Sequence, residues 1–162
     1  MLTNPFSQVD DAGSVRAPLV VVAAALVDRD TRVLVLRRRD DKEHGGLWEF
    51  PGGKVESGES PPTALARELA EELCIEVESD AFAALSFATS GEGAARPIVL
   101  LLYVCRQWDG APTVPEADAA AGAAIAWHNA DDLARLALSP DGMPPLDVPL
   151  ANAVVTMLKS LG

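Results

Sequence analysis

The apolar residues of this chain fall into runs that suit strands and, in a few places, into the spacing of helices. The runs at 19–27 and 97–108 are continuous and rich in valine, leucine or alanine, which is typical of strands buried inside a sheet. Shorter runs predict further strands at 33–36, 47–50, 75–78, 81–89 and 123–127. The tight turn at 28–31 predicts that the strands on either side of it form a hairpin.

The strongest helix signal begins at Ser60, which is a good N-cap residue, and continues with Pro61 at the first helical position. Leu65, Leu69 and Leu73 then recur at helical spacing, so one face of this helix is expected to be buried.

Two more helices are expected, at 129–133 and 150–161, and a loop is expected at 111–121. Strands mixed with helices in this order predict an α+β fold, with one mixed sheet between helices. The polar first residues predict a flexible arm at 1–16, followed by a single domain at 17–162.

The charge balance narrows the choice of partners, because 24 acidic and 13 basic residues give a net charge of −11. Such a chain repels nucleic-acid phosphates, so we expect no stable nucleic-acid binding. No apolar run reaches the ~18 to 20 residues of a membrane span, so no membrane binding is expected. Two cysteines are too few for a disulfide framework, and no basic signal segment opens the chain. These features predict a cytoplasmic location and leave monomer and homodimer open.

Three carboxylates crowd one face of the helix that begins after Ser60. Glu68, Glu71 and Glu72 lie at positions i, i+3 and i+4, where like charges repel each other. A solvated acidic face would explain this pattern, and so would a divalent cation with oxygen ligands. The glycine turn 51–54 just before the helix favours the cation, because glycines let the backbone approach a ligand closely. Arg67 is placed to orient Glu71.

The segment from 53 to 75 matches a known motif. Its defined positions are Gly53, Glu59, Arg67, Glu68, Leu69, Glu71, Glu72, Cys74 and Ile75. This pattern resembles the Nudix box of nucleotide diphosphate hydrolases, and the preceding LWEFPGGK segment is similar to the MutT-type branch. The resemblance implies the Nudix fold and a hydrolase.

Within that resemblance, a Mg²⁺ site is implied at the carbonyl of Gly52 and the carboxylates of Glu68, Glu71 and Glu72, with Mn²⁺ as a possible substitute. The implied reaction converts a nucleoside triphosphate into a monophosphate and pyrophosphate. Glu68 and Glu72 are both candidates for the catalytic base, and Arg67 is expected to orient a carboxylate.

The resemblance also implies a substrate-binding set. Arg38 and Lys54 are expected to contact phosphates, and Phe50, or Trp48 beside it, is expected to contribute to the base pocket. Asp147 stands where the MutT branch places a polar base-reading residue. A carboxylate there suits the N1–H and N2–H donors of 8-oxoguanine.

These assignments favour the hydrolysis of 8-oxo-dGTP. A hydrolase of CTP or of modified pyrimidine nucleotides is the alternative, because a CTP-hydrolysing sub-branch also carries aspartate at this position. A nucleotide-sensing Nudix module is a further alternative.

The chain departs from the family pattern at two positions. Cys74 replaces a glycine that usually ends the helix in a left-handed conformation, at an expected strain of about 1 kcal/mol. Ala121 stands where many relatives carry a further metal-binding glutamate, six residues before the tryptophan of the last strand. Glu116 or Asp118 is expected to substitute for it.

Overall fold

The computed structural model describes residues 17–91, 94 and 96–162. Its strands are β1 (Leu19–Leu26), β2 (Val33–Arg37), β3 (Trp48–Glu49), β4 (Gly52–Lys54), β5 (Ala83–Thr89), β6 (Ile98–Cys105) and β7 (Ala124–His128). Its helices are α1 (Pro61–Leu73), α2 (Glu116–Ala120), α3 (Ala130–Leu138) and α4 (Asp147–Leu161), with a 3-10 turn η1 (Ser79–Ala81). The expected arm at 1–16 and part of the turn between β5 and β6 lie outside the described residues.

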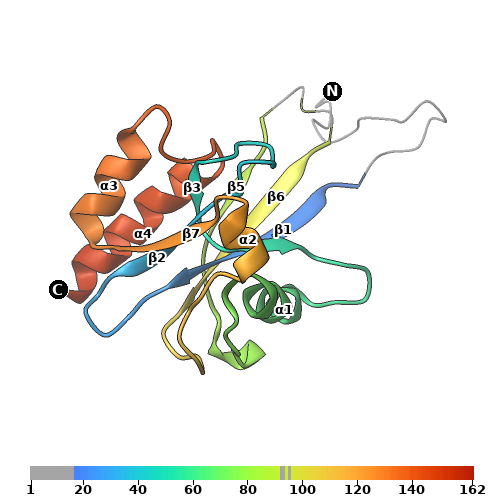
Figure 1. Ribbon diagram of the computed structural model, residues 1–162, viewed down its shortest axis with the longest axis horizontal. Coiled ribbons are helices and arrows are strands. Elements are labelled where there is room, and N and C mark those ends of the chain that lie inside the picture. Colours follow the sequence, from blue (N-terminus) through green and yellow to red (C-terminus); the bar gives the residue numbers. More distant parts are fainter. Residues whose placement is uncertain (1–16, 92–93, 95) are drawn as a thin grey trace, which may run out of the picture.

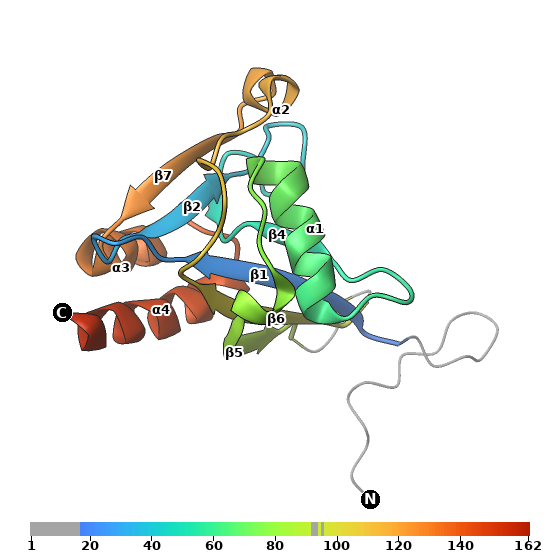
Figure 2. The same ribbon diagram turned by 90° about the horizontal axis from the view of Figure 1, so that it is seen from below.

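The strands form two sheets, and Figure 2 shows β2 and β7 of one beside β1 of the other. The larger sheet has the order β4-β1-β6-β5, and its central pair β1 and β6 is parallel. The smaller sheet has the order β3-β2-β7 and is antiparallel throughout. The α+β expectation is therefore confirmed, but the strands do not form the single sheet that the sequence suggested.

The expected hairpin of β1 and β2 is also wrong. The two strands meet at one bridge, Val27 to Val33, and then diverge into different sheets. The reason is that β1 is apolar along its whole length and occupies a central position, where β4 and β6 take both of its edges.

Helices cover both faces of the larger sheet (Figure 1). Helix α1 packs on β1 and β4 from one side, while α4 packs on β5 and on α3 from the other. Two apolar clusters result: one contains the leucines of α1, and the other contains Leu150, Val154 and Leu158 of α4. No helix in the described part of the chain is long and apolar enough to cross a membrane.

Both ends of α1 follow the sequence signals. The hydroxyl of Ser60 accepts a hydrogen bond from the Thr63 N–H at 3.4 Å, and Pro61 occupies the first turn. Cys74 ends the helix in the left-handed region, with φ 55° and ψ 34°. The helix thus ends as a glycine would end it, although a side chain is present.

Three local elements differ from expectation. The glycine turn at 52–54 forms the edge strand β4, because its backbone pairs with β1. The loop expected at 111–121 contains helix α2. The expected strand at 75–78 is reduced to one bridge between Glu76 and Asp109.

Candidate active site

Two glycines of β4 bring the backbone directly against the acidic face of α1. A Cβ on Gly52 would lie 1.9 Å from the carbonyl oxygen of Val22, so no side chain fits there. A Cβ on Gly53 would lie 2.3 Å from the carboxyl carbon of Glu68. The Gly52 N–H donates to Glu72 Oε2 at 2.9 Å. The turn and the helix therefore form one structural unit, in which Gly52 is required by the backbone of β1 and a side chain at position 53 would displace the carboxylate of Glu68.

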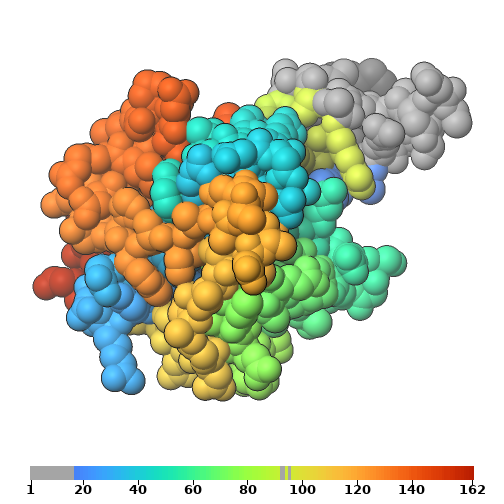
Figure 3. Space-filling view, viewed as in Figure 1, coloured from blue at the N-terminus to red at the C-terminus, as the bar shows by residue number. Residues whose placement is uncertain are grey.

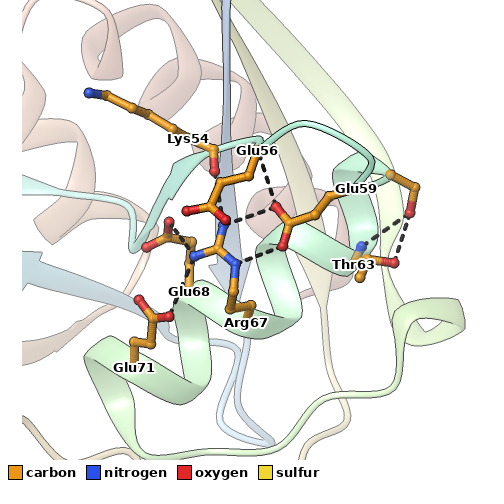
Figure 4. A network of polar contacts seen from close by, with 8 residues as sticks. Lys54, Glu56, Glu59, Thr63, Arg67, Glu68 and Glu71 are labelled. Atoms are coloured by element: carbon orange, nitrogen blue, oxygen red, sulfur yellow. Dashed lines mark hydrogen bonds and ion pairs between the residues drawn. The ribbon is translucent and has the colours of Figure 1, made fainter.

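Arg67 organises the outer side of this unit, as Figure 4 shows. Its guanidinium donates to both carboxylate oxygens of Glu59, at 2.7 and 3.0 Å, and to the carbonyl of Lys54 at 3.1 Å. It also donates to Glu68 at 3.0 Å and lies 3.5 Å from Glu71. Arg67 thus contacts three carboxylates, and Glu59 and Glu68 rather than Glu71, the partner expected from the sequence, are the nearer ones.

Glu59 connects the loop to the helix. Its carboxylate accepts from Arg67 and from the Glu56 N–H at 3.0 Å. The hydrogen bond from Arg67 lowers the pKa of Glu59 to about 2. The carboxylate is therefore ionised under all ordinary conditions and keeps the loop closed over α1.

The inner carboxylates are held in an unfavourable electrostatic environment. Burial raises the pKa of Glu72 to about 8, and the negative charges of Glu49 and Glu68 add to this shift. Burial likewise raises the pKa values of Glu49 and Glu68. Arg38 beside Glu49 and Arg67 beside Glu68 offset these shifts only in part, so a cation beside the carboxylates would relieve their repulsion.

A cavity of about 740 Å³ opens beside Glu72, a volume that is ordinary for a small-molecule site. Its lining includes Arg38, Gly52, Gly53 and Lys54, together with Glu72. It also includes Phe50, Leu100, Pro144 and Asp147. Arg67, Glu68 and Glu71 lie outside its walls. The cavity therefore joins the glycine turn to the start of α4.

Asp147 is buried at the start of α4, with 6% of its surface exposed. Its Oδ1 accepts the N–H of Phe50 at 3.0 Å, and burial raises its pKa to about 7. Phe50 itself is 3% exposed and lines the cavity, whereas Trp48 packs at the edge of the core away from it. Asp147 does not cap α4, so its carboxylate is available to the cavity.

Sequence reasoning missed Glu49. This carboxylate pairs with Arg38, and both side chains are mostly buried. Arg38 also donates to the carbonyl of Glu43 at 2.8 Å. The expected phosphate-binding arginine is thus already held by an acidic partner. A signal was present, because Glu49 is a lone charge in an apolar run.

The three positions considered for an additional carboxylate differ in their surroundings. Asp118 lines the cavity and accepts a hydrogen bond from Arg39 at 2.7 Å. Glu116 does not line the cavity, and Ala121 ends helix α2. Lys54 lines the cavity and makes no ion pair with any described residue.

The donor set suits a hard divalent cation in its chemistry. Three carboxylates and a glycine carbonyl are oxygen ligands of the type that Mg²⁺ prefers. Within residues 17–91, 94 and 96–162, no three acidic, histidine or cysteine side chains are already arranged around a common metal position. Glu72 instead accepts a hydrogen bond from the Gly52 N–H, and Glu68 accepts one from Arg67. Both side chains would have to turn to bind a cation together.

The glycine turn, the acidic helix face and the cavity agree with the comparisons to known proteins. A model of the NUDIX domain matches residues 17–147. The chain belongs to the Nudix family. The earlier resemblance is therefore confirmed, and the protein is a Nudix hydrolase of the pyrophosphohydrolase type.

Two relatives and one solved structure illustrate this membership. The CTP pyrophosphohydrolase of Escherichia coli K12 is 32% identical over 82% of this chain and 93% of its own length. The 8-oxo-dGTP diphosphatase of the same organism is 30% identical over 70% of this chain and 86% of its own. The crystal structure of the MutT NUDIX hydrolase from Burkholderia pseudomallei superimposes with a TM-score of 0.67 at 28% identity, covering 87% of this chain and 98% of that one.

Nudix hydrolases generally use divalent metal cations and act on nucleotides. In this Nudix hydrolase, the carboxylates that would meet such a cation lie on α1 and the cavity lies beside them. The names of the two relatives differ in the base of the substrate.

Proposed function

We propose that this Nudix hydrolase is a Mg²⁺-dependent nucleoside triphosphate pyrophosphohydrolase that acts on 8-oxo-dGTP. The observation that carries the proposal is the single cavity that connects Gly52, Gly53 and Glu72 with Phe50 and Asp147. A triphosphate bound beside Gly52, Gly53 and Glu72 would place its base beside Phe50 and Asp147.

The Gly52 carbonyl and the carboxylates of Glu68, Glu71 and Glu72 would hold Mg²⁺. When bound, the ion neutralises the phosphate charges and makes a bound water a better nucleophile. Arg67 orients Glu68 and Glu71 for this task, and Glu59 holds Arg67 in place. Glu68 or Glu72 would accept the proton of the attacking water.

Cations from two segments would bind the phosphates. Lys54 contributes an exposed ammonium group at the edge of the cavity. Arg38 contributes a guanidinium that Glu49 holds at the cavity wall. Because Glu49 offsets part of the charge of Arg38, Lys54 is the less neutralised of the two cations.

Asp147 would read the base. In the ionised form its carboxylate only accepts hydrogen bonds, which suits the N1–H and N2–H of 8-oxoguanine. One oxygen already accepts the Phe50 N–H, and the other is available to the ligand. Phe50 supplies an apolar wall beside it.

CTP is the second candidate, and the raised pKa of Asp147 favours it. With a pKa of about 7, a large fraction of this carboxyl is protonated at neutral pH. A protonated carboxyl both donates and accepts, which suits the N3 acceptor and the amino donor of cytosine. The similarity to a CTP pyrophosphohydrolase supports the same candidate.

A substrate panel tests the proposal. Canonical and oxidised nucleoside triphosphates are incubated with Mg²⁺, and pyrophosphate is measured separately from phosphate. We expect monophosphate and pyrophosphate, with 8-oxo-dGTP turned over fastest. Release of phosphate in place of pyrophosphate contradicts the reaction, and a strong preference for CTP contradicts the base.

A further inference from the structure

Three consecutive arginines, Arg37, Arg38 and Arg39, stand at the end of β2 and do not share one partner segment. Arg38 turns to Glu49 on β3. Arg39 instead crosses to helix α2, where its Nη1 donates to Asp118 Oδ1 at 2.7 Å, although the two residues are 79 positions apart in sequence. Figure 3 shows the segment after β2 and the α2 segment in direct contact.

Two further contacts join the same segments. The Asp40 N–H donates to the carbonyl of Ala121 at 2.9 Å, and Arg37 donates to the carbonyl of Gly122. A Cβ on Gly122 would lie 2.3 Å from the carboxylate of Asp40. Helix α2 is therefore connected to the β2–β3 loop at three neighbouring points.

This connection lies at the cavity. Arg39 and Asp118 both line the cavity that contains Gly52 and Glu72. Helix α1, which carries the acidic face, contributes Glu72 to the same cavity. A change in the position of α2 would alter the width of the cavity.

We propose that the Arg39–Asp118 ion pair is a latch that fixes α2 to the β2–β3 loop and sets the width of the cavity. Asp118 is a positioning residue in this proposal, which rests on the proposed function. Its carboxylate is held by a guanidinium rather than left free for a cation. An exposed ion pair contributes little to global stability, so its effect is confined to the segments it joins.

Asp41 provides a matched control. Its carboxylate also accepts two hydrogen bonds from Arg39, at 2.9 and 2.8 Å, but it belongs to the same loop as Arg39. Asp41→Asn and Asp118→Asn each remove one acidic partner from Arg39. Only Asp118→Asn removes the ion pair between Arg39 and α2, while the contacts to the carbonyls of Ala121 and Gly122 remain in both variants.

The first measurement is amide hydrogen exchange of residues 116–123 in the substrate-free, full-length protein. We expect Asp118→Asn to accelerate exchange about two- to fivefold, the range set by the weak energy of an exposed pair. We expect Asp41→Asn to leave the amide exchange rate of residues 116–123 unchanged. The double variant R39D/D118R, which swaps the two charges, should restore the slow rate. Equal rates in the two asparagine variants overturn the latch.

The second measurement compares kcat/KM for a nucleoside triphosphate with that for the diphosphate of the same base. Asp118→Asn is expected to lower this ratio severalfold and to leave the preference between bases unchanged. A collapse of kcat on every substrate, with normal exchange in α2, would show that Asp118 is a metal ligand and overturn the latch. If the wild-type protein hydrolyses no nucleotide, the proposed function fails, while the exchange experiment still tests the latch.

Discussion

The backbone N–H of Phe50 donates to Oδ1 of Asp147 at 3.0 Å, across 97 positions of sequence and inside the core. This hydrogen bond attaches the start of α4 to the segment that leads into the glycine turn. The group proposed to read the base is thereby held at a fixed place relative to the group proposed to bind the phosphates.

The pKa of Asp147 predicts a pH-dependent choice of base. The folded pKa of about 7 means that the acceptor-only form prevails above neutral pH and the protonated form below it. Because 8-oxo-dGTP is read by the ionised form and CTP by the protonated form, we expect the ratio of kcat/KM for 8-oxo-dGTP to that for CTP to rise about 100-fold between pH 6 and pH 8. Both substrates are supplied in one reaction, so that titration of the metal site cancels.

Asp147→Asn supplies the comparison for this measurement. Asparagine can still accept the Phe50 N–H, but it has no proton to lose in this range. Its selectivity ratio should therefore be constant with pH. A wild-type ratio that is equally flat would remove Asp147 from base recognition.

Addition of Mg²⁺ should stabilise the folded protein. A ligand that binds only the native state at a hundredfold its Kd adds about 2.7 kcal/mol, or roughly 5 to 10 °C in Tm for a chain of this size. The pKa of Glu72 is raised to about 8 by burial. The cation must displace this proton, so the increase in Tm should be larger at pH 8.5 than at pH 6.5.

Variants of the acidic face locate this effect. Glu68→Gln and Glu72→Gln should each reduce the Mg²⁺-induced rise in Tm and lower kcat by several orders of magnitude. Glu78 is an exposed residue outside α1. Glu78→Gln should therefore leave the Mg²⁺-induced rise in Tm and the kcat unchanged. The metal assignment is wrong if the two α1 variants respond to Mg²⁺ as the wild type does.

Arg67→Lys should lower kcat by about 10- to 100-fold with a smaller change in KM. Lysine cannot reproduce the planar fork that contacts both oxygens of Glu59 together with Lys54 and Glu68. The carboxylates of α1 would then lose their common support. Steady-state kinetics test this, and Arg135→Lys, an exposed change on α3, is the control.

Cys74→Gly should stabilise the protein by about 1 kcal/mol. Cys74 has a φ of 55°, a conformation that glycine adopts without strain. Urea unfolding measures the change. Cys74→Ala retains a Cβ and should give no such gain, so equal stabilisation by alanine would assign the effect to the loss of the thiol.

The parts of the molecule set by local chemistry could be predicted from sequence. Ser60, Pro61 and the leucine stripe define α1 because capping and helical spacing act within a few residues. The same holds for α3, whose N-cap Asn129 accepts the Asp132 N–H at 2.9 Å. The family motif was equally local, since its positions lie on one loop and one helix.

The parts of the molecule that depend on pairing between distant segments could not be predicted from the sequence. The glycines of β4 carry no strand signal, and they form a strand only because β1 offers them an edge. The partners of Arg38 and Arg39 also could not be predicted from the sequence. The chain is rich in acidic residues, and different folds would bring different ones of them to these arginines. The division into two sheets has the same origin.

The parallel pairing of β1 with β6 has a consequence for how this protein folds. Leu19 is aligned with Ile98, and every later pair in the register spans a similarly long stretch of chain. Contacts of such long range must overcome a large loop-closure entropy, and they slow folding. The candidate site depends on the pairing of β4 with β1 and on the hydrogen bond between Phe50 and Asp147. We therefore expect the site to be completed after helix α1 has formed. During synthesis, the acidic motif at 53–75 would thus leave the ribosome well before β6 and Asp147 are present to complete the site.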